Sequence, residues 1–428
     1  MTLKTRRFLF VGFFIIFVPI SFGVIFYSAG WRFDFKTFSL QKTGGIYIET
    51  KPKDVMIKLD GKIIPNDSGL IRRGTLISNL FPQKYEIKIE KNGYLPYYKN
   101  LKVEPSLVSE IIDTILIPEK IEKKIVISQK LRGDEISDFS DNVKQIIVKN
   151  SKNYFLSDFK DRSSVFNVSA AINNLRGKTE IKKISFHPFN QQNLIIEESN
   201  GLDIFNIDQP KLEFIFRNST SSRLSAWTAK NSYIYYVEEK DEAKNEKTYA
   251  LFFYNLLIKT RGQIAQLPAK PISNILVSDS GAQIALLNNS GDLHIFSAES
   301  QKLEQIAHNA EIFAFSPDSK KIAFADADGK LNVHFIEDWN KNIRKKAGET
   351  INIKYQTSNA KPIKNIVWHK DSFHLFAELG DEIRIIEIDD RPLLNEYLLV
   401  QEIKDFYYDL KSDIVYFIQN ENLYSLEI

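Results

Sequence analysis

The sequence predicts an all-β body that follows one N-terminal transmembrane helix. Three observations lead to this prediction: a long uncharged apolar run near the N-terminus, a middle stretch in which apolar and polar residues alternate, and a repeated sequence pattern of short apolar strands separated by turns along the C-terminal part. Cysteine is absent from all 428 residues, which excludes disulfides, thiolate catalysis and cysteine-based zinc sites.

The apolar run covers residues 8–29 and contains no charged side chain. As a helix it would span about 33 Å, enough to cross the roughly 30 Å hydrocarbon layer of a bilayer. Lys4, Arg6 and Arg7 precede it, whereas an aromatic and nearly charge-balanced flank follows it. The positive-inside bias therefore predicts a single-pass cell-membrane protein, with a cytoplasmic basic stub at residues 1–7 and an extracytoplasmic body.

A cleaved signal peptide is the alternative interpretation of this run. The small residues at 28–30 could form a cleavage site, but the apolar region of a signal peptide is usually shorter than this one. Residues 30–43 are predicted to be a linker in either case.

The large C-terminal part is slightly acidic. Residues 119–428 carry 40 basic and 44 acidic side chains. Because phosphate binding needs a concentrated basic surface, this balance argues against nucleic acid as a partner.

Residues 44–118 alternate between apolar and polar in short runs, which is typical of strands with one buried face. Asp60-Gly61 and Asn92-Gly93 supply residues that tolerate the positive φ of tight hairpins. This stretch is therefore predicted to be a small antiparallel β-sandwich.

The same stretch resembles the PEGA domain, a small β-sandwich module of prokaryotic surface proteins. Residues 45–48 look like its opening strand, and Pro52-Lys53-Asp54-Val55 stands where its Pro-Glu-Gly-Ala turn occurs, with only the proline kept. Residues 60–62 resemble its next hairpin, and residues 91–94 resemble its late Gly-Tyr turn. The resemblance implies a cell-envelope spacer or interaction module and brings no catalytic residue.

A repeated phrase runs through residues 119–428: an apolar strand, a turn of about five residues, and a second apolar strand. Seven copies recur at spacings of 38 to 53 residues, and a third strand follows in each. This period predicts a seven-bladed β-propeller, with a pair of sandwiches or a solenoid as the alternative. The segment 123–128 is predicted to close the ring as the outer strand of the last blade. The residues that end the first strand of each copy are Phe139, Phe186, Trp227, Val277, Phe315, Trp368 and Tyr408.

The repeats resemble WD-repeat-like propellers, particularly the bacterial type with a Phe-Ser-Pro-Asp-Gly phrase. Phe315-Ser316-Pro317-Asp318-Ser319 departs from that phrase only in its last residue. The other copies follow it more loosely.

The sequence predicts no catalytic, cofactor-binding or metal-ligating residue and no cofactor. His369 and His374 lack the spacing of a zinc helix and fall in a predicted strand–turn–strand, while His187 and His369 both follow the last residue of a first strand, which suggests one rim of the ring. The remaining histidines, like these three, are interpreted as polar or edge positions; they are His294, His308 and His334.

Two further segments have a structural interpretation. Residues 326–329 are better explained as a hairpin turn than as a calcium loop, because the further oxygen ligands are missing. The charged run 238–247 is interpreted as a solvated hairpin tip, with a docking loop as the alternative. The chain contains no G-x-S-x-G elbow and no phosphate-binding glycine motif.

These observations together favour a non-enzymatic, membrane-anchored interaction or scaffold protein of the prokaryotic cell envelope. Its partners would be the membrane, through residues 8–29, and an envelope protein or surface polymer. An enzyme or small-ligand receptor with a site in the central channel is the alternative function. A structural element of a surface layer is a third interpretation.

Overall fold

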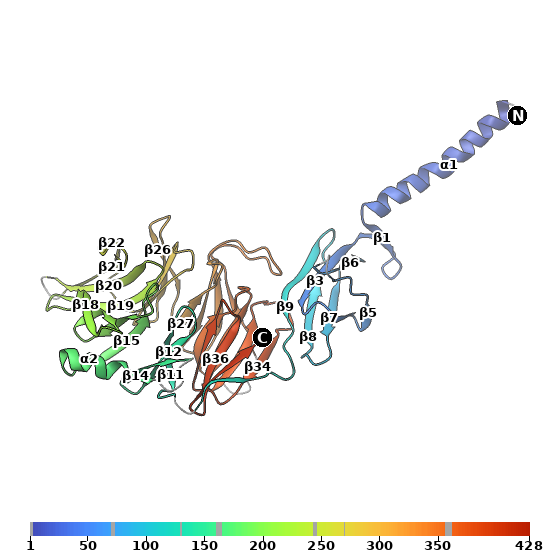
Figure 1. Cartoon of the computed structure of the whole chain (residues 1–428). Coiled ribbons are helices and arrows are strands. Elements are labelled where there is room, and N and C mark those ends of the chain that lie inside the picture. The colour runs from blue at the N-terminus through green and yellow to red at the C-terminus, as the bar shows by residue number, and fades with distance from the viewer. Residues whose placement is uncertain are drawn as a thin grey trace. The chain divides into compact units, whose positions relative to one another are not determined.

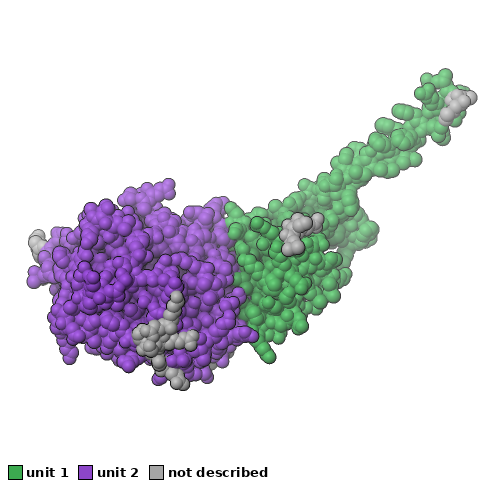
Figure 2. Space-filling view, viewed as in Figure 1, with its two compact units in different colours: residues 1–120, 340–344, 389–395 green, residues 121–339, 345–388, 396–428 purple. Residues whose placement is uncertain are grey.

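The computed structural model describes residues 3–69, 73–128, 131–159, 165–242, 246–268, 270–355 and 362–428. It confirms a mostly β protein with one long N-terminal helix (Figure 1). The chain divides into two compact units (Figure 2). Unit 1 is Met1–Lys120 with Asn340–Arg344 and Asp389–Asn395, and unit 2 is Ile121–Trp339, Lys345–Ile388 and Glu396–Ile428.

Helix α1 (Leu3–Ser28) contains the apolar run and begins within the stretch expected to be a basic stub. None of its side chains is buried, and by length and composition it can span a membrane. Its last turn ends where the amide of Ala29 donates to the carbonyl of Ile25 at 2.9 Å. Gly30 then takes a φ of +83°, a conformation that favours glycine.

Residues 30–43, which the sequence predicts to be a linker, contain regular secondary structure. They form a hairpin of β1 (Trp31–Asp34) and β2 (Ser39–Lys42). The carboxylate of Asp34 organises the turn by accepting from the amide of Lys36 at 2.9 Å and from the hydroxyl of Thr37 at 2.8 Å. Strands of four residues are too short to show a clear alternation in the sequence.

The strands within residues 44–118 form two sheets around one core. The three-stranded sheet has the order β6-β3-β9 and the four-stranded sheet the order β5-β4-β7-β8. Buried apolar side chains from both sheets pack together, as the alternating burial of β7 illustrates. The strands are β3 (Gly44–Lys51), β4 (Met56–Leu59), β5 (Lys62–Ile64), β6 (Thr75–Leu80), β7 (Lys84–Glu90), β8 (Tyr97–Lys102) and β9 (Val108–Ile115).

One pairing in these sheets corrects the antiparallel prediction. Strands β3 and β9 run parallel, with Ile48 opposite Ile111. Parallel neighbours need a long connection, and here the chain passes through five intervening strands before β9 returns beside β3. Alternation in a sequence shows which face of a strand is buried, but it does not show the direction of the neighbouring strand.

Two short segments from later in the chain complete unit 1. The side-chain amide of Asn342 accepts from the amide of Ile112 at 2.6 Å and donates to its carbonyl at 2.7 Å. Asn395 pairs with the backbone of Tyr98 in the same way, at 3.1 and 2.8 Å. In each case an asparagine satisfies both backbone groups of a strand residue, as a neighbouring strand would.

Unit 2 contains seven four-stranded antiparallel sheets within the described residues, and sheets 1 to 6 each use four strands in chain order. The strands of sheets 1 to 3 are β11 (Glu135–Phe139), β12 (Gln145–Asn150), β13 (Asn153–Asp158) and β14 (Val165–Asn167); β15 (Ile181–Phe186), β16 (Asn193–Glu198), β17 (Gly201–Asn206) and β18 (Lys211–Arg217); and β19 (Ser222–Lys230), β20 (Tyr233–Asp241), β21 (Lys247–Asn255) and β22 (Thr260–Leu267).

Sheets 4 to 6 have the same order. Their strands are β23 (Ile272–Val277), β24 (Gln283–Asn288), β25 (Leu293–Ser297) and β26 (Lys302–Ala307); β27 (Ala310–Phe315), β28 (Lys321–Asp326), β29 (Leu331–Phe335) and β30 (Thr350–Ile353); and β31 (Ile363–Trp368), β32 (His374–Leu379), β33 (Glu382–Glu387) and β34 (Glu396–Val400).

Sheet 7 combines strands from both ends of the unit. It consists of β35 (Asp405–Asp409), β36 (Ile414–Gln419), β37 (Asn422–Glu427) and β10 (Lys124–Ile127). Strand β10 pairs antiparallel with β37, with Lys124 opposite Ser425. This is the pairing that the repeat pattern predicts for the segment 123–128.

Successive sheets of unit 2 contact each other, chiefly through their first strands. Strand β11 contacts β15, β19 contacts β23, β23 contacts β27, β27 contacts β31, and β35 contacts β11. Between sheets 2 and 3 the ammonium of Lys183 donates to the carbonyl of Trp227 at 3.0 Å. Between sheets 6 and 7 the rings of Phe376 and Tyr408 lie 4.7 Å apart. The contacts thus run from sheet 1 through sheet 7 and back to sheet 1.

Unit 2 also contains a helix that the sequence patterns did not predict, α2 (Val168–Arg176). The side chain of Asn167 caps its first turn by accepting from the amide of Ala170 at 2.9 Å. At its other end Arg176 pairs with Asp203 at 2.8 Å, and Arg217 pairs with the same carboxylate at 2.6 Å.

The charged hairpin of sheet 3 differs in part from its prediction. Glu238 is not solvated but buried, because β20 and β21 are nine residues long and carry this position inside the sheet. Its carboxylate accepts from the hydroxyl of Ser222 at 2.5 Å and pairs with Arg261. Residues 243–245 of the predicted tip lie outside the described residues.

Candidate functional site

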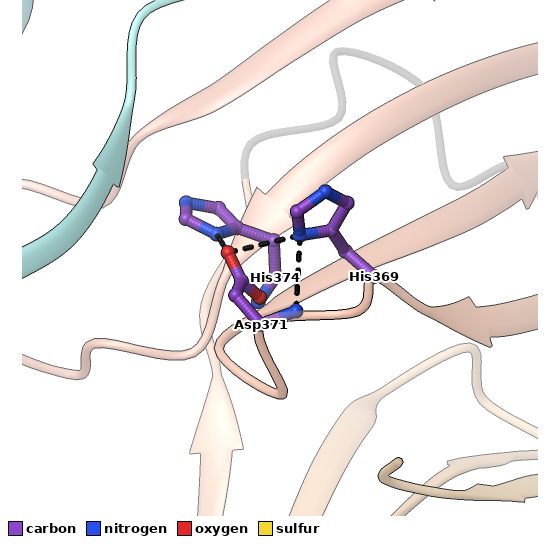
Figure 3. Close-up of side chains that lie close together, drawn as sticks. All are labelled: His369, Asp371 and His374. Carbon is purple, nitrogen blue, oxygen red and sulfur yellow. Dashed lines mark hydrogen bonds and ion pairs between the residues drawn. The ribbon is translucent and has the colours of Figure 1, made fainter. Parts of the chain in front are cut away.

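Three polar side chains from sheet 6 of unit 2 converge in the turn between its first two strands (Figure 3). His369 follows β31, Asp371 lies in the turn and His374 begins β32, so the predicted strand–turn–strand is confirmed. The amide of His369 donates to the carbonyl of His374 at 2.9 Å and closes the turn, within which Ser372 has a φ of +58°. This closure brings together two imidazoles that are five residues apart in the sequence.

Asp371 organises this cluster. Its Oδ1 accepts from the amides of Phe373 and His374, at 2.8 and 3.0 Å. Its Oδ2 lies 2.9 Å from Nδ1 of His369 and 2.7 Å from Nδ1 of His374. All three side chains are buried, with 2% of His369, 6% of Asp371 and 8% of His374 exposed.

His369 also reaches sheet 7. Its Nε2 lies 3.0 Å from Oδ1 of Asp413, the last residue of the turn between β35 and β36. The hydroxyl of Tyr408 donates to the same oxygen at 2.7 Å, and the ammonium of Lys370 lies 2.6 Å from the other. The imidazole of His369 therefore bridges carboxylates of two neighbouring sheets. We call His369, Asp371, His374 and Asp413 the histidine cluster.

The charges of the histidine cluster follow from these contacts. Burial lowers the pKa of His369, but its hydrogen bonds to Asp371 and Asp413 outweigh burial and raise that pKa to about 9. Burial also opposes the charge of Asp371, yet the two histidines hold its pKa well below the usual value. Contacts with His369, Lys370 and Tyr408 likewise lower the pKa of Asp413 in spite of burial. At neutral pH the bridge is thus an imidazolium between two carboxylates.

Serine occupies the position of His369 in three other sheets. Ser140, Ser278 and Ser316 each accept from the backbone amide five residues later, at 2.9, 3.1 and 3.0 Å. Those hydroxyls satisfy their own turns. His369 is longer, and it reaches across to the next sheet as well.

Other contacts also link the first turns of successive sheets. The hydroxyl of Ser319 in sheet 5 accepts from the amide of Ser280 in sheet 4 at 3.0 Å. The hydroxyl of Ser372 in sheet 6 accepts from the amide of Asp318 in sheet 5 at 3.1 Å. The histidine cluster continues this chain of contacts from sheet 6 to sheet 7 with charged groups in place of neutral ones.

The cluster also offers the donor atoms of a metal site. One atom each from His369, Asp371 and His374 lies within 4.8 Å of the others. Two imidazoles and a carboxylate suit Zn²⁺, and the Nε2–H of His369 donating to Asp413 would be the outer-shell contact that orients a histidine ligand. In the hydrogen-bonded arrangement described above, protons lie between the same two imidazole nitrogens and the carboxylate oxygen of Asp371. Because the side chains are buried, the arrangement is suited to linking sheets and presents little surface to a substrate.

The other histidines lie on different sheets. His187 occupies the turn after β15, where its Nδ1 accepts from the amides of Phe189 and Asn190 at 3.2 and 3.3 Å. His308 lies 2.8 Å from Asp292, and His334 lies 2.9 Å from the hydroxyl of Thr350. His294 lies on β25. None of these four belongs to the histidine cluster.

The turn at residues 326–329 is the hairpin that the sequence predicts. The amide of Gly329 donates to the carbonyl of Asp326 at 2.8 Å, and the carboxylate of Asp326 accepts from the amides of Asp328 and Lys330 at 3.1 and 2.8 Å. The carboxylate therefore supports the turn between β28 and β29.

A polar hollow of about 450 Å³ lies between sheets 4 and 5. Asparagine and serine supply half of its lining residues, and small or apolar residues and one carboxylate supply the rest; the polar ones are Ser273, Asn288, Asn289, Ser290, Asn309 and Glu311.

The carboxyl group of Glu378, buried on β32, and that of Asp405, half-buried at the start of β35, have raised pKa values. Burial and the charge of Asp405 raise the pKa of Glu378 to about 7. Burial also raises the pKa of Asp405 to about 6, although the amide of Ile136 donates to its carboxylate at 2.6 Å. The ammonium of Lys364 lies 3.7 Å from the carboxylate of Glu378.

The sequence does not single out the two carboxylates of the histidine cluster. Asp371 stands two residues after His369, where Asp318 stands two residues after Ser316. Aligning the turns by that phrase could have shown that Asp371 supports the turn. Asp413 could not be found in this way, because its contact depends on the packing of two sheets. No protein-family model matches the chain, and a search of curated proteins found no related sequence.

Proposed function

We propose that this protein is a membrane-anchored, extracytoplasmic interaction or scaffold protein of the prokaryotic cell envelope, without enzymatic activity. The observation that carries the proposal is α1, an apolar helix of 26 residues with no buried side chain, which precedes two β-rich units. An uncharged helical run that is apolar on all sides and leaves its side chains unburied fits a lipid environment.

Unit 2 is proposed to be a seven-bladed propeller that presents loops to a partner. Seven four-stranded sheets, contacts from each to the next, and the pairing of β10 with β37 support this architecture. Unit 1 is proposed to be a PEGA-like spacer. Its two sheets around one core support that proposal, with Pro52 between β3 and β4 where the motif resembles the family's turn.

The orientation can be tested directly because the chain contains no cysteine. Single cysteines would be placed at Ser300, an exposed residue of unit 2, and at Lys4 as the matched control on the other side of α1. We expect an impermeant maleimide to label S300C in intact spheroplasts and K4C only after the membrane is opened. Labelling of K4C alone in intact spheroplasts would show the opposite topology. Release of either cysteine variant from the membrane by carbonate would refute the anchor.

The interaction role needs a second experiment. A photoreactive side chain would be introduced at the exposed residue Asn289 or Ser300 of unit 2 and, as a control, at the exposed residue Ile63 of unit 1. We expect a discrete cross-linked band from a unit 2 position that is absent without illumination. If no unit 2 position gives a band in the native membrane, the proposed interaction role is not supported.

The hollow of about 450 Å³ favours a second candidate function, a receptor for a small polar ligand such as a saccharide. Ligand-observed NMR with neutral oligosaccharides tests it. Binding should be lost in Asn289→Asp and kept in Asn200→Asp, an exposed asparagine in the corresponding hairpin of sheet 2. Equal spectra for both variants would remove this candidate.

A further inference from the structure

The hairpin of β1 and β2 exposes an unusual number of aromatic side chains for its size. Phe35 is 77% and Phe38 is 80% exposed, while Phe33 and Leu40 are about half exposed. The ring of Phe33 lies 5.1 Å from that of Phe35 and 6.3 Å from that of Phe38, both edge to face. These rings contact one another and remain largely open to solvent. Such a contiguous apolar group on a small element indicates a contact surface.

The hairpin is held against the end of α1. The guanidinium of Arg32 lies 3.5 Å from the centre of the Tyr27 ring and donates to the Tyr27 carbonyl at 2.6 Å. The ring of Trp31 meets that of Phe26 edge to face at 6.1 Å. At the base, the amide and hydroxyl of Thr43 both donate to the carbonyl of Gly30 at 2.9 Å. The hairpin therefore begins where the helix ends.

This attachment fixes the distance of the hairpin from a bilayer that α1 crosses. The uncharged residues 8–29 span about 33 Å, which matches the roughly 30 Å hydrocarbon layer, so the helix leaves the layer at its last turn. From Ser28 to Trp31 the chain can extend about 10 Å at most. A strand of four residues adds only about 13 Å. No part of the hairpin therefore lies more than about 23 Å beyond the last turn of α1, and its base lies at the headgroup layer.

The charges of the hairpin suit the same environment. Residues 31–42 contain the cations Arg32, Lys36 and Lys42 and one acid, Asp34. Asp34 is engaged in the turn, since its pKa is lowered by hydrogen bonds from the amide of Lys36 and from Thr37. Lys42 lies 5.6 Å from the centre of the Trp31 ring. Aromatic rings beside cations are the side chains that gather at membrane interfaces, and the net positive charge favours anionic headgroups.

We infer that the hairpin of β1 and β2 is an interfacial membrane contact: Phe35 and Phe38 insert at the boundary between headgroups and acyl chains, while Lys36 and Lys42 face the lipid phosphates. The partner is the outer leaflet of the same bilayer that α1 spans. This inference rests on the proposed membrane anchoring. It adds a second contact, which holds the start of unit 1 at the lipid surface.

The absence of cysteine allows each position to be labelled singly in the full chain. An environment-sensitive fluorophore would be attached to F35C and F38C, with V24C in α1 as the reference for the anchor. The matched controls are I63C and L76C, two exposed apolar positions of unit 1, 65% and 55% exposed. The chain would be reconstituted in vesicles of phosphatidylcholine with about a quarter phosphatidylglycerol. Iodide would serve as the aqueous quencher, and lipids brominated near the headgroup would serve as the membrane quencher.

We expect brominated lipid to quench F35C and F38C, and iodide quenching at these positions to be several-fold weaker than at I63C and L76C. If F35C and F38C are quenched like the two controls while V24C remains in lipid, the inference is overturned and the anchor stands. If V24C is also open to iodide, the proposed anchoring itself fails. If protection at positions 35 and 38 depends on the protein-to-lipid ratio without lipid quenching, the hairpin binds a second copy and the inference is overturned.

A second variant tests the contact without labels. Phe35→Ser combined with Phe38→Ser leaves α1 intact and changes two exposed side chains, so folding should be unaffected. We expect Arg32, Lys36 and their neighbours to become more accessible to trypsin in vesicles, with the far-ultraviolet circular dichroism unchanged. Identical protection of the wild-type and double-variant hairpins would contradict a role for the two rings.

Discussion

Replacing His369 by glutamine removes the positive charge that lies between Asp371 and Asp413. The contacts with these two carboxylates raise the pKa of His369 from 6.5 to about 9, although burial opposes the charge. At about 1.4 kcal/mol per pH unit, this rise corresponds to roughly 3 kcal/mol of stability. The folded state holds the proton more tightly than the unfolded state does. The stabilisation is therefore fully present below pH 6.5 and is lost as the pH rises through about 9.

Urea unfolding followed by tryptophan fluorescence measures this contribution, because Trp368 directly precedes His369. We expect the stability difference between the wild type and His369→Gln to shrink by roughly 3 kcal/mol between about pH 6 and about pH 9.5. His308→Gln is the matched control, since His308 also pairs with a carboxylate but its side chain is 75% exposed. A difference that stays constant with pH would refute the imidazolium bridge.

Two further substitutions test other buried positions. In Glu378→Gln we expect about 2–3 kcal/mol of added stability at pH 8, because burial and Asp405 raise the pKa of this carboxyl from 4.5 to about 7. The wild type therefore loses stability as the pH rises from 4.5 to about 7, and the loss is complete at pH 8. The urea midpoint of the variant should vary less than that of the wild type between pH 4.5 and 7, and an equal slope would count against the assignment. In Ile127→Lys we expect the free energy of unfolding to fall by about 3 kcal/mol or more and the Tm to fall with it, because the residue is buried in β10. Ile125→Lys, on the exposed face of the same strand, is the control and should change the Tm little. Equal effects of the two substitutions would argue against the pairing of β10 in sheet 7.

The repeated strands could be predicted from the sequence because apolar periodicity is a local property. Phe186, Val277 and Phe315 each end a first strand, as the phrase indicates. The features that escaped prediction depend on weak local signals or on tertiary pairing. Helix α2 has only nine residues, and the direction of β9 beside β3 leaves no trace in either strand.

Less of the candidate site than of the fold could be predicted from the sequence. The strand–turn–strand around His369 and His374 could be predicted, and their five-residue spacing excluded a helical metal pair. It did not exclude a meeting across a tight turn, where the amide of His369 and the carbonyl of His374 are hydrogen-bonded. Asp413 lies on another sheet, so its contact with His369 is a consequence of packing and cannot be read from spacing.

The pairing of β10 with β37 has a consequence for biosynthesis. Lys124 and Glu427, which face each other at 2.9 Å, lie 303 residues apart in the sequence. Because synthesis proceeds from the N-terminus, β10 leaves the ribosome long before its partner β37 has been made. The edge of β10 therefore stays unpaired while the other sheets of unit 2 are synthesised. If the body is exported as proposed, sheet 7 is completed only after residue 427 has crossed the membrane. Pairing of β10 with β37 would then occur only once β37 itself has been translocated.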